Sequence, residues 1–186
     1  NLQQGSSTSA SGNDRLQNIE NVIAGTGNDT LTGDGGANTL DGGTGDDVLE
    51  GLDGDDTLVG GDGTDTASYA NASGSVNVSL ADHAATGAEG SDTLVDIENV
   101  TGSSHDDTLE GDDGVNTLLG GAGNDTLVAT GGNDILSGER GSDTVDYGNA
   151  DGAINADLNA GKVTGMGTDT LSGIENLVGS DFNDEI

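Results

Sequence analysis

The stretch over residues 24–68 reads AGTGNDTLT GDGGANTLD GGTGDDVLE GLDGDDTLV GGDGTDTAS, which is five copies of one nonapeptide without a gap. The same frame returns over residues 102–146 with five more copies. Across the ten copies the fourth place is Gly except at His105, the sixth is Asp except at Asn38 and Asn116, and the eighth is always apolar. A register that holds three residue types at once in two blocks predicts a repeat architecture.

Each nonapeptide predicts a turn followed by a short strand. Glycine allows the positive φ angles that a tight turn needs, so the first six places are expected to form the turn. The last three places, typically Thr-Leu-x, are expected to form the strand. Because side chains alternate along a strand, the eighth residue points inward and its two neighbours point outward.

The composition forbids an ordinary hydrophobic core. Aromatic residues make up 2% of the chain, Gly contributes 35 residues, and 35 acids against three basic residues give a formal charge of -32. A chain with so little apolar area and so much charge needs a source of stability outside itself. Nucleic acids and anionic membranes require a basic face, so they are excluded and a cation is the expected partner. The lack of Cys excludes disulfides and thiolate metal sites.

The repeat resembles the G-G-x-G-x-D-x-U-x nonapeptide of the calcium-binding RTX (repeats-in-toxin, haemolysin-type) family. The resemblance implies an all-β fold, a right-handed parallel β-roll (a β-solenoid) with two nonapeptides in each coil. It also implies that the cation is Ca²⁺. RTX segments are typically exported by type I secretion, stay unfolded in the low calcium of the cytosol and fold outside the cell.

In such a roll the sixth-place side chains form columns, because place n stacks on place n+18 at the spacing of neighbouring strands, about 4.8 Å. Two carboxylates at that separation repel by about 1 kcal/mol in water and about 3 to 4 kcal/mol at an effective dielectric of about 20. A Ca²⁺ between successive coils reverses this effect, because it takes about six to eight oxygens from carboxylates and backbone carbonyls. At least six ions are therefore predicted, between Asp29 and Asp47, Asp47 and Asp65, Asn38 and Asp56, Asp107 and Asp125, Asp125 and Asp143, and Asn116 and Asp134.

Carbonyl oxygens of the glycine-rich turns are expected to complete each site. The candidates are Gly25, Gly27, Gly43, Gly45, Gly54, Gly61, Gly63, Gly114, Gly121, Gly123, Gly132 and Gly141. Because the unfolded chain holds no preformed site, the free energy of calcium binding would be folding free energy.

Two glutamates outside the blocks continue the same frame. Glu20 and Glu98 lie in repeated Ile-Glu-Asn segments, eighteen residues before Asn38 and Asn116. We expect each Glu to reach toward the calcium site beside its Asn, where the neutral amide offsets the extra acid. The alternative is that Ile-Glu-Asn is only a packing motif, and the sequence leaves the two open.

The chain contains about two and a half copies of a unit of some 78 residues, because Tyr69 and Leu80 recur at that separation as Tyr147 and Leu158. Between the blocks, apolar residues alternate with polar ones and predict half-buried strands at Val76, Val78 and Leu80 and at Ile154, Ala156 and Leu158. The expected organisation is the end of a preceding joining unit (1–23), a first repeat block (24–68), a joining unit (69–101), a second repeat block (102–146), a second joining unit (147–178) and the start of a third block (179–186). We expect these parts to form one elongated solenoid within a longer protein.

Other uses of these residues are less well supported. The acids belong to the repeat, and Arg15, Arg140 and Lys162 are too few and too scattered for a catalytic site, so the segment is not expected to be an enzyme. His83 and His105 are expected at the surface, and Tyr69 and Tyr147 are expected to pack at the ends of the rolls. Because His105 replaces a turn glycine, the pair of Asp107 with Asp125 is the least secure of the six. No regular outward array of Thr and Asn remains to support ice binding.

The expected function is calcium-dependent folding that supports the secretion, folding and stability of a larger secreted or cell-surface protein. The expected partners are calcium ions, other domains of that protein and a type I secretion apparatus, without nucleic acid or membrane insertion. An alternative is an adhesin segment whose joining units bind a glycan or a cell surface.

Overall fold

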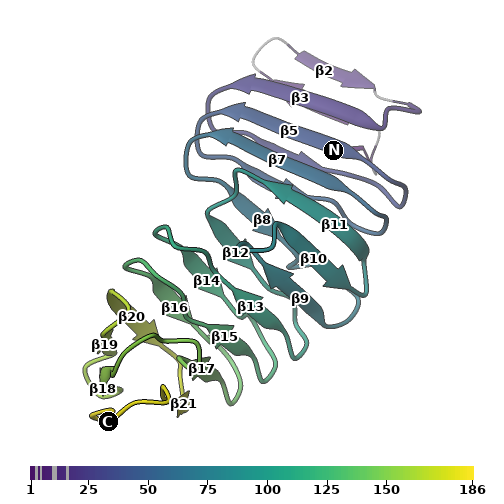
Figure 1. Ribbon diagram of the computed structural model, residues 1–186. Coiled ribbons are helices and arrows are strands. Elements are labelled where there is room, and N and C mark those ends of the chain that lie inside the picture. The colour runs from purple at the N-terminus through teal and green to yellow at the C-terminus, as the bar shows by residue number, and fades with distance from the viewer. Residues whose placement is uncertain (3, 5, 10–11, 16) are drawn as a thin grey trace.

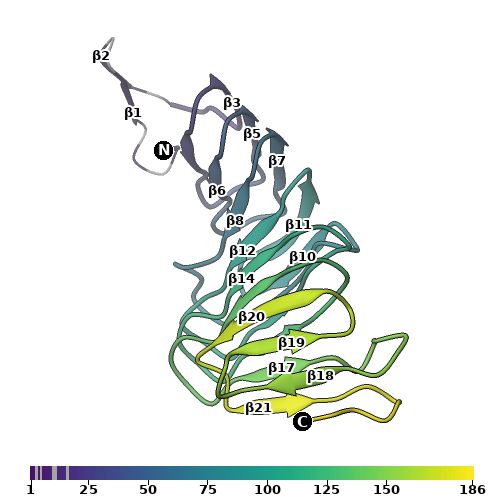
Figure 2. The ribbon, with the colours of Figure 1, turned by 90° about the vertical axis from the view of Figure 1, so that its left-hand side faces the viewer.

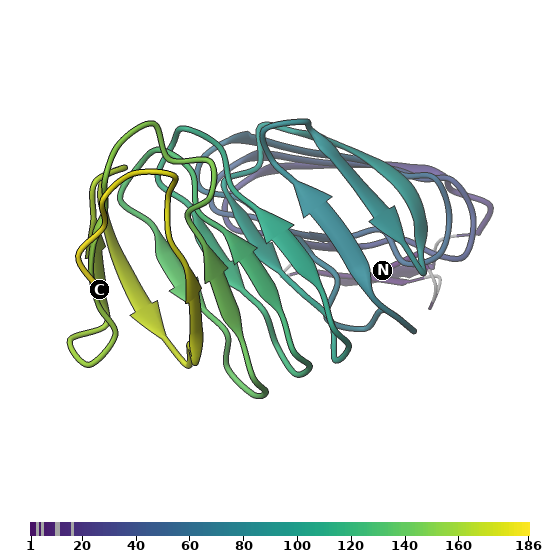
Figure 3. The same cartoon turned by 60° about the horizontal axis from the view of Figure 1, so that its bottom comes forward.

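Short strands and glycine-rich turns make up the fold, as the nonapeptide pattern predicts. The computed structural model describes residues 1–186 apart from residues 3, 5, 10–11 and 16, and every element in the described part is a strand (Figure 1). Two long sheets form the two walls of a flattened stack of coils, which Figures 2 and 3 show from the side and from below.

The first sheet contains, in spatial order, β3 (Asn21–Thr26), β5 (Thr39–Thr44), β7 (Thr57–Asp62), β11 (Gly90–Val95), β10 (Ala84–Gly87), β9 (Val76–Ser79), β13 (Thr108–Glu110), β15 (Thr126–Val128), β17 (Thr144–Asp146) and β21 (Asn176–Val178). The second contains β4 (Thr30–Thr32), β6 (Val48–Glu50), β8 (Thr66–Ser68), β12 (Asn99–Thr101), β14 (Thr117–Leu119), β16 (Ile135–Ser137), β20 (Thr168–Ser172), β19 (Lys162–Thr164) and β18 (Asn155–Asp157). β1 (Ser6–Ser9) and β2 (Gly12–Arg15) pair separately as an antiparallel hairpin.

Within the blocks each strand pairs in parallel with the strand eighteen residues further on. Leu40 lies opposite Leu58 in the first block, and Leu109 lies opposite Leu127 in the second. Consecutive nonapeptides fall in opposite sheets, so two of them close one coil. This arrangement confirms the predicted parallel β-roll.

The eighth-place residues form the core. Leu40, Leu49, Leu58, Leu109 and Leu127 are completely buried between the two sheets. Their strand neighbours are half-buried or exposed, which gives the expected alternation. At roughly 1.5–3 kcal/mol for each buried Leu, the resulting apolar column is narrow but continuous along the stack.

Each joining unit inserts antiparallel strands into a parallel sheet. In the first unit β10 pairs antiparallel with β9 and β11, and these join β13 and β7 in parallel on either side. In the second unit β18, β19 and β20 are antiparallel, and β20 joins β16 in parallel.

The two predicted half-buried strands differ at one residue. Val76, Val78 and Leu80 are buried, whereas Leu158, the counterpart of Leu80, is 38% exposed. β9 has a neighbour on each side, but β18 is the last strand of its sheet in the described structure, so less of its surroundings is covered.

Candidate metal centre

Sixth-place side chains form two columns along the edges of the roll, directly before the strands of each sheet. The column beside the second sheet contains Asp29, Asp47, Asp65, Glu98, Asn116, Asp134 and Asp169. The column beside the first sheet contains Glu20, Asn38, Asp56 and Asp92 and, beyond the joining strands, Asp107, Asp125, Asp143 and Glu175. The structure thus brings together all six predicted pairs.

The six pairs share one contact between neighbouring coils. In each pair the backbone N–H of the earlier residue donates to the Oδ1 atom of the later one. The N···O distances are 2.7 Å for Asp29 to Asp47, 2.7 Å for Asp47 to Asp65, 2.7 Å for Asn38 to Asp56, 2.9 Å for Asp107 to Asp125, 2.8 Å for Asp125 to Asp143 and 3.0 Å for Asn116 to Asp134. The carboxylate of the later residue in each pair therefore reaches back toward the preceding coil.

The second carboxylate oxygen is the unusual feature of these residues. The Oδ2 atoms of Asp47, Asp56, Asp65, Asp125 and Asp143 are buried and have no hydrogen-bond partner. A buried acceptor without a partner costs about 1–3 kcal/mol, and more when it is charged. A hard cation between the coils would satisfy these oxygens, so the residues present fit a bound metal ion.

Burial also changes the pKa values of the carboxylates in the columns. Burial raises the pKa of Asp56, Asp125 and Asp134 to about 6, although the N–H that each accepts opposes the change. Burial also raises the pKa of Asp65 and Asp143. In the absence of a cation, the folded protein therefore disfavours the charged form of these carboxylates.

Glycine at the first place of a repeat makes room for the unpartnered oxygen. A Cβ added at Gly51 would overlap the Oδ2 atom of Asp56, and one at Gly120 would overlap that of Asp125. The same holds for Gly42, Gly60 and Gly138 with the Asp of their own repeats. Ala24 and Ala129 replace this glycine in the repeats of Asp29 and Asp134, whose Oδ2 atoms are not among the buried unpartnered ones.

Nine of the ten repeat turns are of two kinds, and the turn over residues 129–137 fits neither, because only its fourth place, Gly132, has positive φ. In the open kind, the second and fourth places have positive φ, as in Gly43 and Gly45, and Leu52 and Glu139 adopt it at the second place. Of the turn glycines predicted as carbonyl ligands, eleven adopt positive φ: Gly25, Gly27, Gly43, Gly45, Gly54, Gly61, Gly63, Gly121, Gly123, Gly132 and Gly141. The exception is Gly114, whose φ is not positive.

In the closed kind, a side chain at the second place holds the turn. The carboxylate of Asp112 accepts from the N–H of Gly114 at 2.7 Å, and the N–H of Asp112 donates to Asn116 Oδ1 at 2.8 Å. Asp34 and Asn38 form the same arrangement. Because these side chains satisfy one another, the closed turn needs less from a cation.

The turn at His105 is also closed, as its missing glycine suggested. Ser103 donates its N–H to Asp107 Oδ2 at 2.5 Å, and its hydroxyl accepts from the N–H of His105. The pair of Asp107 with Asp125 nevertheless forms. His83 and His105 are both exposed, and the side chain of Arg15 lies outside the described part.

The predicted direction of the two glutamates is corrected by the structure. The Glu98 side chain does not turn toward Asn116, because its Oε2 accepts from the N–H of Asp65 at 2.7 Å. The part of Glu98 that Asn116 contacts is the backbone carbonyl. Glu98 thus behaves like every sixth-place Asp. Glu20 is exposed, and no hydrogen bond joins its carboxylate to Asn38. Glu175 accepts from the N–H of Asp143 at 2.9 Å, a role that its own Ile-Glu-Asn segment could have signalled.

Two further acids in the columns have a tyrosine as partner. Tyr69 donates its hydroxyl to Asp92 Oδ2 at 2.9 Å, and Tyr147 donates to Asp169 Oδ2 at 2.8 Å. Asp92 and Asp169 also accept from backbone N–H groups through Oδ1. A hydroxyl therefore satisfies the oxygen that is left unpartnered inside the blocks. The sequence predicted only packing for these tyrosines.

Side chains alone do not form a complete metal site. No group of three or more His, Cys, Asp or Glu side chains in the described residues converges closely enough to hold an ion. Backbone carbonyl oxygens would have to complete such a site, and some of them face the next coil. A Cβ on Gly43 would overlap the carbonyl oxygen of Gly25, and one on Gly61 would overlap that of Gly43, so these oxygens face the next coil.

Four matches to the family model described as the RTX calcium-binding nonapeptide repeat cover more than half of the chain, over residues 18–49, 32–67, 101–136 and 119–152. The chain belongs to this RTX family. The ten residues of the six pairs in this RTX segment all lie inside the matched ranges. Ca²⁺ is therefore the ion that its repeats bind. No curated protein matched the chain. No helix among the described residues of the segment is long and apolar enough to span a membrane.

Proposed function

We propose that this RTX segment folds when it binds extracellular calcium, and that the folded roll supports the secretion, folding and stability of a larger secreted or cell-surface protein. The observation that carries the proposal is the set of five buried Oδ2 atoms without partners. Ions bridging the sixth-place pairs, at least six in number, would satisfy these oxygens together with turn carbonyls.

The charge of the chain explains why calcium would decide between the folded and unfolded states. At a net charge of -32, the columns oppose folding through repulsion and through loss of hydration. Calcium binds the folded roll and not the unfolded chain, so it shifts the equilibrium by mass action. In low calcium the chain would stay unfolded and could pass a type I secretion apparatus. Higher calcium outside the cell would then fold it.

Far-ultraviolet circular dichroism of the chelated protein, titrated with Ca²⁺ and separately with Mg²⁺, tests this proposal. We expect a cooperative change from coil to β signal with Ca²⁺ only. A β spectrum that survives chelation, with no calcium bound, would show that the roll stands by itself and that the acid columns have another role.

Two variants with equal loss of charge make the test specific. Asp125→Asn removes a paired, buried carboxylate, whereas Asp82→Asn removes an exposed one in the joining unit. Asn116 shows that the amide fits a sixth place. We therefore expect Asp125→Asn to raise the calcium midpoint of folding and Asp82→Asn to leave it almost unchanged. Equal midpoints for the two variants would contradict the assignment of Asp125.

Localisation can be tested on the parent protein in its own cells. An antibody to the folded segment should detect it in the culture medium or on intact cells, and should not detect folded segment in the cytosol. Folded segment retained inside cells would contradict the proposed export.

A further inference from the structure

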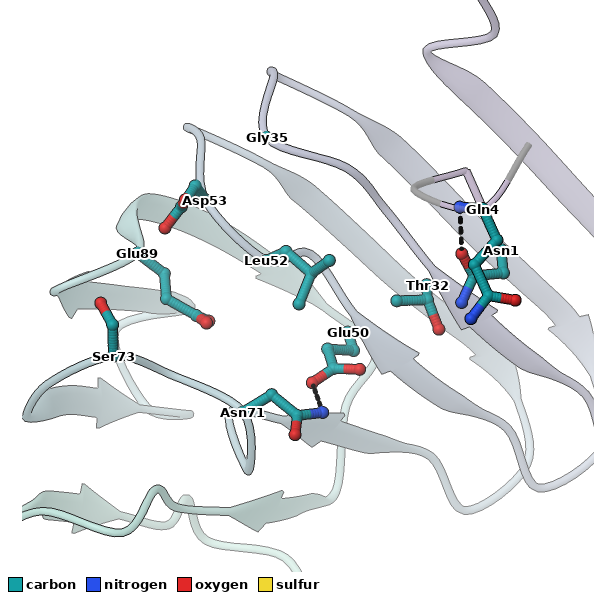
Figure 4. Close-up of a pocket in the computed structure, with 10 residues that line it drawn as sticks. All are labelled: Asn1, Gln4, Thr32, Gly35, Glu50, Leu52, Asp53, Asn71, Ser73 and Glu89. Carbon is teal, nitrogen blue, oxygen red and sulfur yellow. Dashed lines mark hydrogen bonds between the residues drawn. The ribbon is translucent and has the colours of Figure 1, made fainter. Parts of the chain in front are cut away.

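A pocket beside the first joining unit contains acids that do not belong to either column. Its volume is about 480 Å³, and it lies between the end of β6, the turn that follows β6, the loop after β8 and the turn between β10 and β11 (Figure 4). Glu50, Asp53 and Glu89 line it with Asn71 and Ser73. Asn71 donates its amide to Glu50 Oε1 at 2.7 Å, which fixes the side of the pocket opposite Glu89.

Glu89 is the residue that needs an explanation. It is only 6% exposed, its Oε2 atom is buried without a hydrogen-bond partner, and its carboxylate points into the pocket (Figure 4). Burial, followed by the negative charge of Glu50, raises its pKa to about 7. A buried carboxylate without a partner is unfavourable unless a counter-charge accompanies it. No Lys or Arg lines the pocket among the described residues, and Asn1 and Gln4 line it on the side of Thr32, away from Glu89 (Figure 4).

The second joining unit provides an internal comparison. At a separation of 78 residues, Glu50 and Asp53 correspond to Val128 and Gly131. The pair Ala88-Glu89, between Gly87 and Gly90, is replaced by the single residue Met166 between Gly165 and Gly167. All three acids of the first pocket are therefore absent from the second.

The second pocket shows that the fold does not need a carboxylate at this place. It has a volume of about 380 Å³ and is lined by Gly131, Asn149, Asp151 and Met166, among others. Met166 packs against the core, and the two acids that line this pocket, Asp113 and Asp151, are both exposed. An apolar side chain thus closes the turn in one unit, whereas the other unit has a buried acid that faces a second acid.

We propose that the pocket of the first joining unit binds a hard divalent cation through Glu89 and Glu50, at a site separate from the sixth-place columns. Carboxylate, amide and hydroxyl oxygens are the ligands that Ca²⁺ takes, and Asp53, Asn71 and Ser73 supply them around the two glutamates. None of the described residues that line the pocket has an aromatic side chain to stack against a sugar ring, which disfavours a glycan as the occupant.

The size of the pocket indicates how the cation would be held. The volume exceeds that of a bare ion, and side chains alone do not form a cluster of three acids there. The ion would therefore keep part of its water shell, and its affinity would fall in the weak range of extracellular modules, about 10⁻⁴–10⁻³ M. The bound cation would link the turn between β10 and β11, through Glu89, to the end of β6, through Glu50.

Equilibrium dialysis with Ca²⁺ up to millimolar concentrations tests the site. We expect Glu89→Met and the isosteric Glu89→Gln to bind one ion fewer than the unmodified chain, with the tighter sites unchanged. Circular dichroism in saturating calcium should show that both variants fold. Asp151→Asn, in the corresponding pocket of the second unit, is the control and should not change the number of ions.

The resistance of the folded chain to urea provides a second test of the proposed cation site. At calcium concentrations just sufficient to fold the chain, Glu89→Met should resist urea better than the unmodified chain, because it removes an unpaired buried carboxyl. In millimolar calcium this advantage should shrink or reverse. An unchanged number of ions in both variants, or an advantage independent of calcium, would overturn the proposal. If the unmodified chain bound no calcium at any site, the proposed function itself would fail instead.

Discussion

The first-place glycine of each repeat has a role beyond the turn. At Gly120 a Cβ would overlap Oδ2 of Asp125, so glycine determines where the second carboxylate oxygen lies. The repeat with Ala129 illustrates the alternative, because Asp134 keeps its Oδ1 contact with Asn116 but its Oδ2 is not among the buried unpartnered atoms. All five buried unpartnered Oδ2 atoms belong to repeats with Gly at the first place.

Gly120→Ala should weaken calcium binding without destroying the fold. The overlapping atom ends a side chain that can rotate, so the expected cost is about 1 kcal/mol, and the calcium midpoint of folding should rise by about three- to tenfold. The midpoint is measured by circular dichroism. Gly152→Ala is the control, because a Cβ there meets nothing within 4 Å and its φ does not exclude Ala. A midpoint equal to that of the control would show that Asp125 Oδ2 does not need its present position.

At single residues, the sequence predicted pairs better than it predicted side-chain directions. The period of nine placed Asp29 and Asp47 together because it counts residues along a regular coil. It could not predict that a carboxylate reaches back to the previous coil, which is why Glu98 was assigned to the wrong neighbour. A usable signal was present for the closed turns, since Asp34 and Asp112 are the second-place acids of the two repeats with Asn at the sixth place.

At the scale of the element, a hydroxyl in the joining units satisfies the oxygen that the proposed cation would satisfy in the blocks. The Tyr69 hydroxyl donates to Asp92 Oδ2 where the blocks leave this oxygen unpartnered, and Tyr147 repeats the contact with Asp169. Both tyrosines are buried, at 2% and 0% exposure. The joining strands thus continue the columns with contacts that need no metal ion.

Tyr69→Phe should destabilise the folded segment by about 1–3 kcal/mol in saturating calcium, because it leaves a buried carboxylate oxygen without a donor. Urea unfolding measures the change. The double variant Tyr69→Phe with Asp92→Asn should lose less than the sum of the single variants, because the two residues share one contact. Additive losses would mean that the hydroxyl and the carboxylate act independently, and the same cycle on Tyr147 and Asp169 should agree in sign.

The strands of the joining units were only partly predictable from the sequence. Alternation at Val76, Val78 and Leu80 correctly indicated which side chains are buried, because the period of two depends only on the pleat. It carries no information about the partner strand, so the antiparallel pairing of β10 was not foreseen.

At the scale of the whole molecule, an odd number of repeats determines where each joining unit lies. Five nonapeptides make two and a half coils, so the first and last strands of a block lie in the same sheet, β4 and β8 in the second and β13 and β17 in the first. The joining unit that follows then begins in the opposite sheet. The first joining unit accordingly inserts into the first sheet, through β9, β10 and β11, and the second inserts into the second sheet, through β18, β19 and β20. A block with an even number of repeats would place successive joining units on the same wall.

The whole acidic molecule should respond to pH in opposite directions with and without calcium. Folding raises the pKa of Asp56, Asp125 and Asp134 from 3.8 to about 6, so the calcium-free folded state binds protons more tightly than the unfolded chain. Its free energy of unfolding should therefore rise as pH falls from about 6 toward 4, and this gain should disappear as pH rises through 6. Protons also compete with calcium for these oxygens, so the calcium midpoint should increase below pH 6.

Circular dichroism at pH 7.5 and 4.5, with chelator and in calcium titrations, checks both directions of this pH response. Lowering the pH reduces the repulsion among all the acids of the chain. The contribution of the column acids must therefore be distinguished from that of the exposed acids. The triple variant Asp56→Asn, Asp125→Asn and Asp134→Asn should lose most of the pH response. The control with the same change of charge, Asp82→Asn, Asp151→Asn and Asp181→Asn, alters three exposed acids and should keep it. Equal responses in the two variants would assign the pH dependence to overall charge, and the buried columns would then have no special part in it.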